Sequence, residues 1–302
     1  MSATKLIDTV SKRFQEFGFP LNFDRAVVPE DDTTLFVCSG MQRIKERFRA
    51  TDGSSYGSIQ SCIRTNDLDL IGDGSHLTYF EMIGNFSFDG PSYDYSVNLW
   101  DSILADLGWK NRVEIHVHPS RPDHRKLWEK LSHHVVNDSE CIWSDGEISG
   151  ECSEVYAPWC NYLEIGNLVN PLGHSTDVGF GLERMVQLME SKDRVDETSI
   201  FNQALSPVTR DHVRALSAMK DNGVVPGNKG RSYVCRRLLR RILRETDADV
   251  PQLRDWLGEE RSLLERQLIV AKKLWRKYKD KSPEWWWDTC GLTEPDLVLL
   301  KP

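Results

Sequence analysis

An arginine, a histidine and a phenylalanine at close spacing form the first segment that could bind a nucleotide. Arg64 ends a run of alternating polar and apolar residues, a polar loop with glycines follows, and His76 and Phe80 lie in the next run. A guanidinium can hold a phosphate through two hydrogen bonds, and a phenylalanine ring offers a flat face to a base. The pattern therefore favours a nucleotide site, although core packing is an alternative explanation for Phe80 and a solvated loop position for His76.

A second segment combines a carboxylate, two glycines and an arginine. It reads Asp177-Val-Gly179-Phe-Gly181-Leu-Glu183-Arg184. The glycines let the backbone approach a ligand closely, and Arg184 would point back from the first turn of a helix. Tight packing of a strand against a helix explains the same glycines without a ligand. A third segment, from Tyr162 to Asn170, alternates in the manner of a strand and carries Asn167.

These segments need a sheet to bring them together. Residues 57–64 and 76–82 are expected to form an antiparallel strand pair. We predict further strands at 34–38, 113–118, 141–143, 162–170 and 175–178, and helices at 5–17, 95–107, 122–136 and 179–190. Beyond residue 200 the pattern is almost wholly helical. The sequence thus predicts an α+β fold, with a catalytic domain over 1–199, built on an antiparallel sheet flanked by helices, and a small α-helical domain over 200–302.

Charge is distributed unevenly along the 302 residues. The net charge of −8 argues against bulk affinity for nucleic acid, but residues 1–200 carry −14 and residues 201–302 carry +6. In the second part Arg236, Arg240 and Arg244 recur every four residues and would form a stripe along an amphipathic helix. The stripe would contact phosphates, face solvent, or pair with the acidic first domain.

The cysteines and hydropathy indicate a cytoplasmic protein. Seven cysteines are an odd number without a CxxC pair, which favours reduced thiols. Cys141, Cys152 and Cys160 lack the short spacing of structural zinc sites, and His116 and His118 are more simply surface or core histidines, so we expect no protein-bound metal. The sequence has no apolar run long enough to span a membrane and no secretory signal at its start.

In combination, the motifs resemble those of the alanyl-tRNA synthetases, a family of class II aminoacyl-tRNA synthetases. The matching blocks include Gln60-Ser-Cys-Ile-Arg64, Phe80-Glu-Met-Ile-Gly-Asn-Phe-Ser-Phe88, Cys152-Ser-Glu154, Glu164-Ile-Gly-Asn167-Leu-Val169, Asp177–Arg184, and Arg236-Arg-Leu-Leu-Arg-Arg241. The resemblance runs from about residue 30 to residue 292. The 80–88 and 236–241 blocks, in this order, make it highly specific.

Several positions depart from the family pattern. The loop after Arg64 lacks the usual Gly-Gly-Lys-His-Asn run, and Gly166 stands where the family commonly has tryptophan. The resemblance also leads us to expect that the family's zinc-dependent editing domain and C-terminal domain are absent from this chain.

The resemblance implies an ATP-dependent ligase that activates alanine as alanyl-adenylate with Mg²⁺ and transfers it to tRNA. Arg64 would bind the α-phosphate, Arg184 the γ-phosphate and a face of adenine, with His76, Phe80 and Gly181 completing the ATP site. Asp177 would hold the ammonium group of alanine. The remaining amino-acid-binding residues would be Met82, Trp143, Asn167, Val169 and Gly179.

The acceptor stays open at this stage. The resemblance implies that the tRNA acceptor stem contacts Asn228, Arg236, Arg240 and Arg244. The alternative is an alanyl-adenylate-forming enzyme that passes alanine to a carrier-protein thiol or a small amine or hydroxyl in a biosynthetic pathway. A catalytically inactive paralogue is disfavoured because Arg64, Asp177 and Arg184 are intact.

Overall fold

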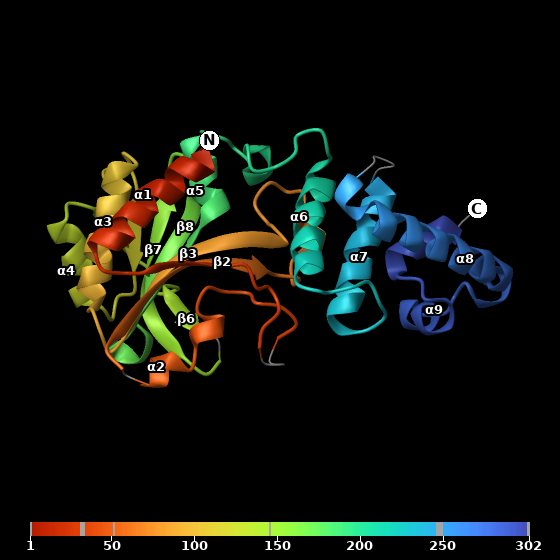
Figure 1. Cartoon of the computed structure of the whole chain (residues 1–302), viewed down its shortest axis with the longest axis horizontal. Coiled ribbons are helices and arrows are strands. Elements are labelled where there is room, and N and C mark those ends of the chain that lie inside the picture. Colours follow the sequence, from red (N-terminus) through yellow and green to blue (C-terminus); the bar gives the residue numbers. More distant parts are fainter. Residues whose placement is uncertain (1, 31–33, 51, 145, 246–249, 301–302) are drawn as a thin grey trace. The chain divides into compact units, whose positions relative to one another are not determined.

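The computed structural model describes residues 2–30, 34–50, 52–144, 146–245 and 250–300. The chain divides into two compact units, Met1–Asn222 and Gly223–Pro302. The first unit is α+β and the second is helical, as the residue patterns predict. Figure 1 shows the elements of both units.

A mixed sheet forms the centre of the first unit. In the described residues its strands follow the order β1-β2-β3-β9-β8-β7-β4-β5, and β6 pairs with β7 outside this path. The β1–β2 and β4–β5 pairs are parallel and the other pairs are antiparallel. The strand bounds are Leu21–Asp24 (β1), Ser54–Ile63 (β2), Tyr79–Phe88 (β3), Glu114–Val117 (β4), His134–Asn137 (β5), Ile142–Ser144 (β6), Ser149–Ala157 (β7), Leu163–Val169 (β8) and Thr176–Gly181 (β9).

Helices cover one face of this sheet (Figure 1). They are α1 (Ser2–Glu16), α3 (Tyr93–Asp106), α4 (Pro122–Lys130) and α5 (Leu182–Met189). On α1 the buried residues Leu6, Val10 and Phe14 recur every four positions, which places them on one stripe toward the sheet. Because side chains alternate across a strand, the opposite face stays open to form a site.

Sequence reasoning predicted most of the central strands but missed β7 inside the sheet and β1 and β5 at its edges. The expected pair of strands around Arg64 and Phe80 is confirmed by β2 and β3, which pair from Ser54 with Phe88 to Ile63 with Tyr79. Residues 34–38 were expected to be a strand but form bends and coil, and the expected helix 122–136 ends at Lys130 before β5 begins. The prediction had no strand at β7, where small and polar residues hide the alternation.

The structure sets the boundary between the units later than residue 199. Helix α6 (Pro207–Asp221) lies in the first unit, where Asp211 accepts a hydrogen bond from the Thr78 backbone N–H at 2.9 Å. Asn222 at the end of α6 donates to the Arg25 carbonyl at 3.1 Å and accepts from the Val27 N–H at 3.1 Å. These contacts reach residues far away in sequence, so a helical pattern alone could not assign α6 to either unit.

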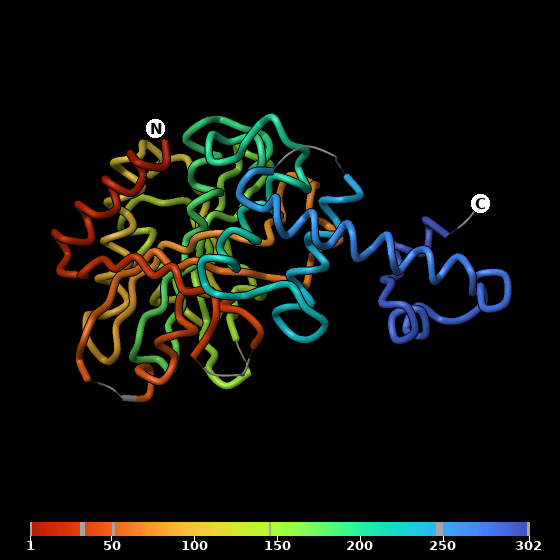
Figure 2. Tube along the Cα trace, turned by 45° about the vertical axis from the view of Figure 1, so that its right-hand side comes forward, coloured from red at the N-terminus to blue at the C-terminus, as the bar shows by residue number. Residues whose placement is uncertain are grey.

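In its described residues the second unit has three α-helices and two 3-10 segments, the first of which is η5 (Pro251–Leu253). The other elements are α7 (Gly230–Glu245), the long α8 (Arg254–Tyr278), α9 (Pro283–Cys290) and η6 (Glu294–Leu300). Figure 2 shows the chain turning after α8 and returning beside its second half, and there Trp286 is fully buried with Leu264 and Ala271. Trp285 packs against the same cluster, whereas Trp287 contacts the Tyr233 ring of α7. In the described residues no helix is long and apolar enough to cross a bilayer.

Candidate active site

A pocket of about 360 Å³ opens on the sheet face opposite the helices. Ile83, Leu168 and Phe180 point into the helix-covered core, and their neighbours Met82, Asn167 and Gly179 line the pocket. The pocket brings together predicted residues from the loop that joins β2 to β3 and from β3, β6, β8, β9 and α5. They are Arg64, His76, Phe80, Met82, Trp143, Asn167, Asp177, Gly179, Gly181 and Arg184.

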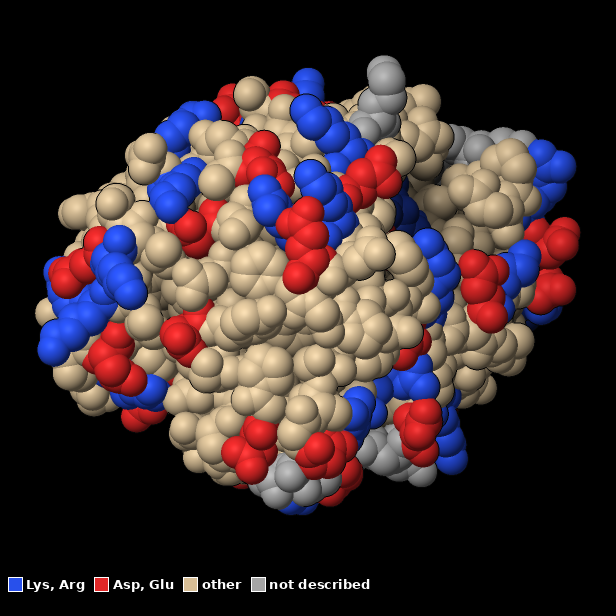
Figure 3. Space-filling model, turned by 60° about the vertical axis from the view of Figure 1, so that its left-hand side comes forward, with Lys and Arg blue, Asp and Glu red and all other residues tan. Residues whose placement is uncertain are grey.

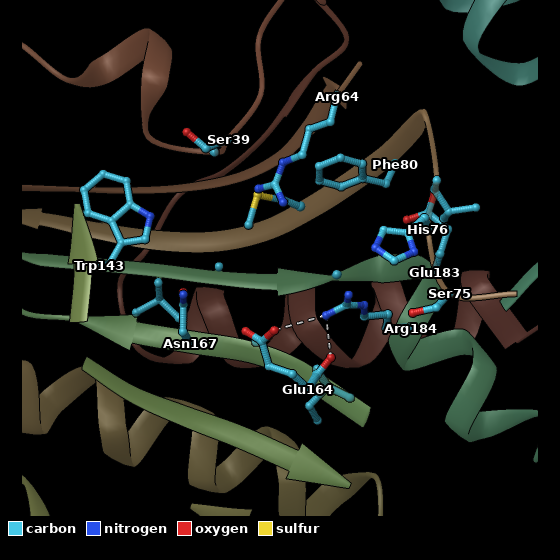
Figure 4. A pocket seen from close by; sticks show the side chains of 18 of the residues that line it. Ser39, Arg64, Ser75, His76, Phe80, Trp143, Glu164, Asn167, Glu183 and Arg184 are labelled. Carbon is cyan, nitrogen blue, oxygen red and sulfur yellow. Dashed lines mark hydrogen bonds and ion pairs between the residues drawn. The ribbon is translucent and has the colours of Figure 1, made fainter. Parts of the chain in front are cut away.

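Arg64 and Phe80 lie together on one wall of the pocket (Figure 4). The Arg64 Nε donates to the Cys38 carbonyl at 3.0 Å, and its guanidinium carbon lies 4.8 Å from the centre of the Phe80 ring. One nitrogen is thereby anchored, and the flat guanidinium lies over an aromatic face. The pair offers charge for a phosphate beside a ring for a planar base.

Arg184 lies across the pocket from Phe80, in the first turn of α5 (Figure 4). Its Nη1 donates to the Glu164 backbone carbonyl at 2.7 Å and to the Glu164 carboxylate at 3.3 Å. The side chain is about one-third exposed, so its contact with Glu164 is partly screened by water. Glu164 was part of the recognised block but was not predicted as a site residue, because the pairing joins residues of different strands and helices.

The loop between β2 and β3 is fixed by an arginine that sequence reasoning missed. Arg194 donates to the carbonyls of Asp73 at 3.1 Å and Gly72 at 2.7 Å. The Asp73 carboxylate in turn holds the His76 Nδ1 at 2.6 Å. His76 is thus oriented at the pocket edge, and no local sequence signal connects it to Arg194.

Glu183 supports the pocket from below rather than facing a ligand. Its Oε2 accepts from the Glu81 N–H at 3.0 Å and its Oε1 accepts from Arg214 Nη2 at 2.5 Å. Burial raises the pKa of the Glu81 carboxyl, and the nearby charge of Glu183 adds to this shift. The arrangement ties β3, α5 and α6 together behind Phe80.

The other end of the pocket is narrow and carries a buried carboxylate. A Cβ on Gly179 would lie 2.6 Å from Cε at the flexible end of Met82, so glycine leaves room here without displacing the methionine. Asp177 is 8% exposed and lines the pocket beside this constriction. Trp143 and Asn167 lie at the same end in Figure 4. The geometry suits a cationic group attached to a small side chain.

One expectation for this end, that Val169 binds the amino acid, differs from the structure. Val169 does not line the pocket but packs against Cys141, Cys152 and Trp143, so it supports the tryptophan from behind. Gly166 does not enlarge the pocket, because a Cβ there would point at the Phe180 ring at 2.4 Å, on the core face. In the core behind the sheet the Phe180 ring stacks on Trp100, with the ring centroids 3.6 Å apart.

The arginine stripe of the second unit is not a free basic surface. Arg236 and Arg240 are buried, and both bind the Glu260 carboxylate, with Nε–O distances of 2.9 and 2.6 Å. Arg244 pairs with Asp296 at 2.8 Å. The expectation that these arginines face a polyanion is therefore not met, since acidic residues from α8 and η6 of the same unit neutralise them. Asn228, whose Oδ1 accepts from Arg236, borders a separate cavity of about 630 Å³.

The end of α8 is the exposed basic region of this unit. Six cationic side chains are exposed there, and none forms an ion pair with a described residue: Lys272, Lys273, Arg276, Lys277, Lys279 and Lys281. Elsewhere charges are mixed. On the face in Figure 3, Lys and Arg lie beside Asp and Glu in small groups around a largely uncharged area, so no single sign dominates that face.

Comparison with known proteins places the sequence in one family. A family model described as tRNA synthetases class II (A) matches residues 14–167 and 166–251. An alanine–tRNA ligase from Neorickettsia sennetsu is 30% identical, with 89% of this chain and 39% of the relative aligned. One from Endomicrobium trichonymphae is 29% identical, over 77% of this chain and 34% of the relative.

The chain spans between about a third and two fifths of the length of these curated relatives. Among solved structures, a pyrrolysyl-tRNA synthetase from Desulfitobacterium hafniense overlaps 65% of this chain and 71% of its own, with 15% identity and a TM-score of 0.43.

Proposed function

Since this chain belongs to the class II (A) family of tRNA synthetases, we propose that it activates alanine with ATP and transfers the alanyl group to tRNA. The observation that carries the proposal is a single pocket with two chemically different ends. Arginines and an aromatic ring lie at one end, and a buried carboxylate beside a narrow constriction lies at the other.

The arginine end receives ATP. The Phe80 ring stacks on one face of adenine, and the Arg184 guanidinium stacks on the other and binds the γ-phosphate. To do so, Arg184 exchanges the Glu164 carboxylate for the more highly charged phosphate. Arg64 keeps its anchor on the Cys38 carbonyl and directs its remaining N–H groups at the α-phosphate. His76, held by Asp73, reaches the phosphates from the loop, and the Gly181 backbone closes the site.

The narrow end receives alanine. Asp177 binds the ammonium group, and Asn167 donates to the carboxyl group. Met82 and Trp143 bound the methyl group, with Gly179 as the floor. A larger side chain would have to displace the Met82 methyl, which already lies 2.6 Å from the position of a Cβ on Gly179. The cost of this displacement favours a small amino acid.

Adenylation then follows from placement and charge. A carboxylate oxygen of alanine attacks the α-phosphorus, the bond to the bridging oxygen breaks, and pyrophosphate leaves. Arg64 stabilises the charge that grows on the α-phosphate in the transition state. A hydroxyl of the tRNA end next attacks the carbonyl carbon, and AMP leaves with the bonding electron pair.

Mg²⁺ accompanies ATP in this proposal. The pocket offers carboxylate oxygens, the ligands that Mg²⁺ prefers, from Asp67 and Glu164, whereas Glu183 is committed to Arg214 and the Glu81 N–H. When bound, the ion would neutralise phosphate charge.

The exposed cations at the end of α8 support RNA as the acceptor, because they remain free to contact phosphates.

ATP–pyrophosphate exchange tests the first half of the proposal. Alanine should stimulate exchange more than valine or leucine does. Arg64→Ala and Asp177→Ala should stay folded and lose about 100-fold or more of the activity. Arg112→Ala is the matched control, since Arg112 is exposed and packs on Trp159 outside the pocket. A preference for a large amino acid, or near-normal exchange in either pocket variant, would sink the assignment.

Charging of tRNA with labelled alanine tests the second half. We expect acid-precipitable alanyl-tRNA that depends on ATP and is lost in Arg64→Ala. Exchange without tRNA charging, together with transfer to a carrier-protein thiol or a small amine, would replace tRNA by another acceptor.

A further inference from the structure

Three metal-binding groups converge beside the pocket but outside its lining. Cys141 lies just before β6, and Cys152 and Glu154 lie on β7. The two sulfur atoms and a Glu154 carboxylate oxygen all lie within 4.8 Å of one another. The Cys152 N–H donates to the Cys141 carbonyl at 3.0 Å, so the two cysteines face each other across a strand pair.

The donor set matches zinc in type and distance. Cys141 and Cys152 are 0% and 1% exposed, so both thiols lie away from bulk solvent. In a tetrahedral zinc site with Zn–S bonds of about 2.3 Å, two sulfur ligands lie about 3.8 Å apart. The three ligand atoms lie within 4.8 Å of one another, about 1 Å more than this sulfur–sulfur distance at most. A small inward movement of the three side chains would therefore bring them to the distances of a zinc site.

The Glu154 carboxylate is already oriented for such a role. Its Oε2 accepts from the Tyr156 hydroxyl at 2.7 Å, and its Oε1 faces the Cys152 sulfur at 3.7 Å. A hydrogen bond that fixes the distal oxygen of a ligating carboxylate is typical of metal sites. The neighbouring His116 binds Glu114 and Asp138 through its two ring nitrogens and so leaves the fourth position to water.

We propose that Cys141, Cys152 and Glu154 form a zinc site with water as the fourth ligand. Binding releases the two thiol protons and joins the start of β6 to β7. Because Trp143 on β6 packs against both cysteines, the metal fixes the tryptophan wall of the pocket without touching the substrate. The cysteine spacing led us to expect no metal, because Cys141 comes next to Cys152 and Glu154 only where two strands pair.

Metal analysis of the full chain tests the site without any assay of activity. Protein expressed with zinc and purified without chelator should contain about one zinc per chain. Cys152→Ser and Glu154→Gln should lose most of it. Cys160→Ser should retain it, because Cys160 is also a buried cysteine of the first unit but contacts Lys192 and Gln187 instead.

Cobalt replacement keeps the test decisive if the cysteine variants fail to fold. Wild-type protein stripped of metal and loaded with Co²⁺ should show the near-ultraviolet charge-transfer band of thiolate ligands. The proposal is overturned by wild type that takes up neither metal, by equal zinc in wild type and a folded Cys152→Ser, or by loss of both thiols to a disulfide.

The effect of zinc on the Trp143 wall of the pocket rests on the proposed function, so it is measured separately through the kinetics of exchange. Removing zinc should raise KM for alanine severalfold and leave KM for ATP near its starting value, because Arg64, Phe80 and Arg184 do not contact β6. If no amino acid supports exchange, the proposed function fails, and the metal content still decides the zinc site.

Discussion

Replacing Arg240 by alanine should destabilise the second unit severely. Arg240 on α7 is 1% exposed and donates to Glu260 at 2.6 Å, Asp296 at 2.7 Å, Gln267 at 2.6 Å and the Gly291 carbonyl at 2.8 Å. These partners belong to α8, η6 and the turn after α9. A single guanidinium therefore connects every helical segment around the small core.

The cost follows from the charges left behind. Without Arg240, the buried carboxylates of Glu260 and Asp296 lose their shared partner, although Arg236 and Arg244 still contact one each. Breaking a buried ion pair from one side costs about 3–5 kcal/mol. For a unit of this size about 1 kcal/mol lowers Tm by 4 °C or more, so the transition of the second unit should fall by roughly 12 °C or more.

Thermal and urea unfolding, followed by circular dichroism and tryptophan fluorescence, measure this effect. Arg244→Ala is the matched control one turn along the same helix, where a partly exposed side chain makes one ion pair with Asp296. Its cost should be smaller than that of Arg240→Ala, because Asp296 keeps its ion pair with Arg240 at 2.7 Å and Glu260 loses no partner. If Arg240→Ala melts within about 2 °C of wild type, the buried network does not hold the unit together, and the reasoning from burial is refuted.

Three further outcomes are expected. Lys272→Glu with Arg276→Glu should leave Tm unchanged but weaken tRNA binding and flatten its salt dependence by up to about two units of slope in a filter-binding assay; unchanged binding would move the RNA contact away from α8. Gly179→Ala should raise KM for alanine more than for glycine in pyrophosphate exchange, whereas wild type should discriminate against glycine and serine by only about 10- to 200-fold; equal changes would mean that the floor does not limit size. Burial lowers the pKa of His124, which stacks on Tyr93, to about 3, so the unfolded chain takes up a proton below about pH 6.5 that the folded chain does not. Stability should fall by up to about 1.4 kcal/mol per pH unit below that point, and His124→Phe should reduce this dependence in urea titrations at pH 7 and 5.

Residue patterns within single segments predicted those parts of the pocket that a single strand pair or turn forms. Alternation around Arg64 and Phe80 gives their strands, and the glycines before Arg184 give the turn from β9 into α5. The alternation of β8 also puts Val169 on the side of Asn167, but cannot tell that Trp143 covers it.

The rest depends on contacts between distant residues. The helix bearing Arg236 and Arg240 was predicted from its amphipathic pattern, yet the fate of its charged stripe depends on Glu260 and Asp296, which lie 20 to 56 residues further along the chain. Strand β7 was missed because Ser, Gly, Glu and Cys alternate there with few large apolar residues. Its position inside the sheet, rather than its own composition, makes it a strand.

The strand order also sets when the pocket can exist during folding. β3 pairs with β9, although β3 ends at Phe88 and β9 begins at Thr176. Closing a loop of this length costs about 4 kcal/mol of chain entropy before any contact between the two strands compensates for it. A chain synthesised from its N-terminus can place Arg64 beside Phe80 early, but Asp177 and Arg184 join them only after the segment between β3 and β9 has emerged. Under the proposed function, ATP binding therefore reports that β3 and β9 have paired, and a chain that ends before β9 should not bind ATP.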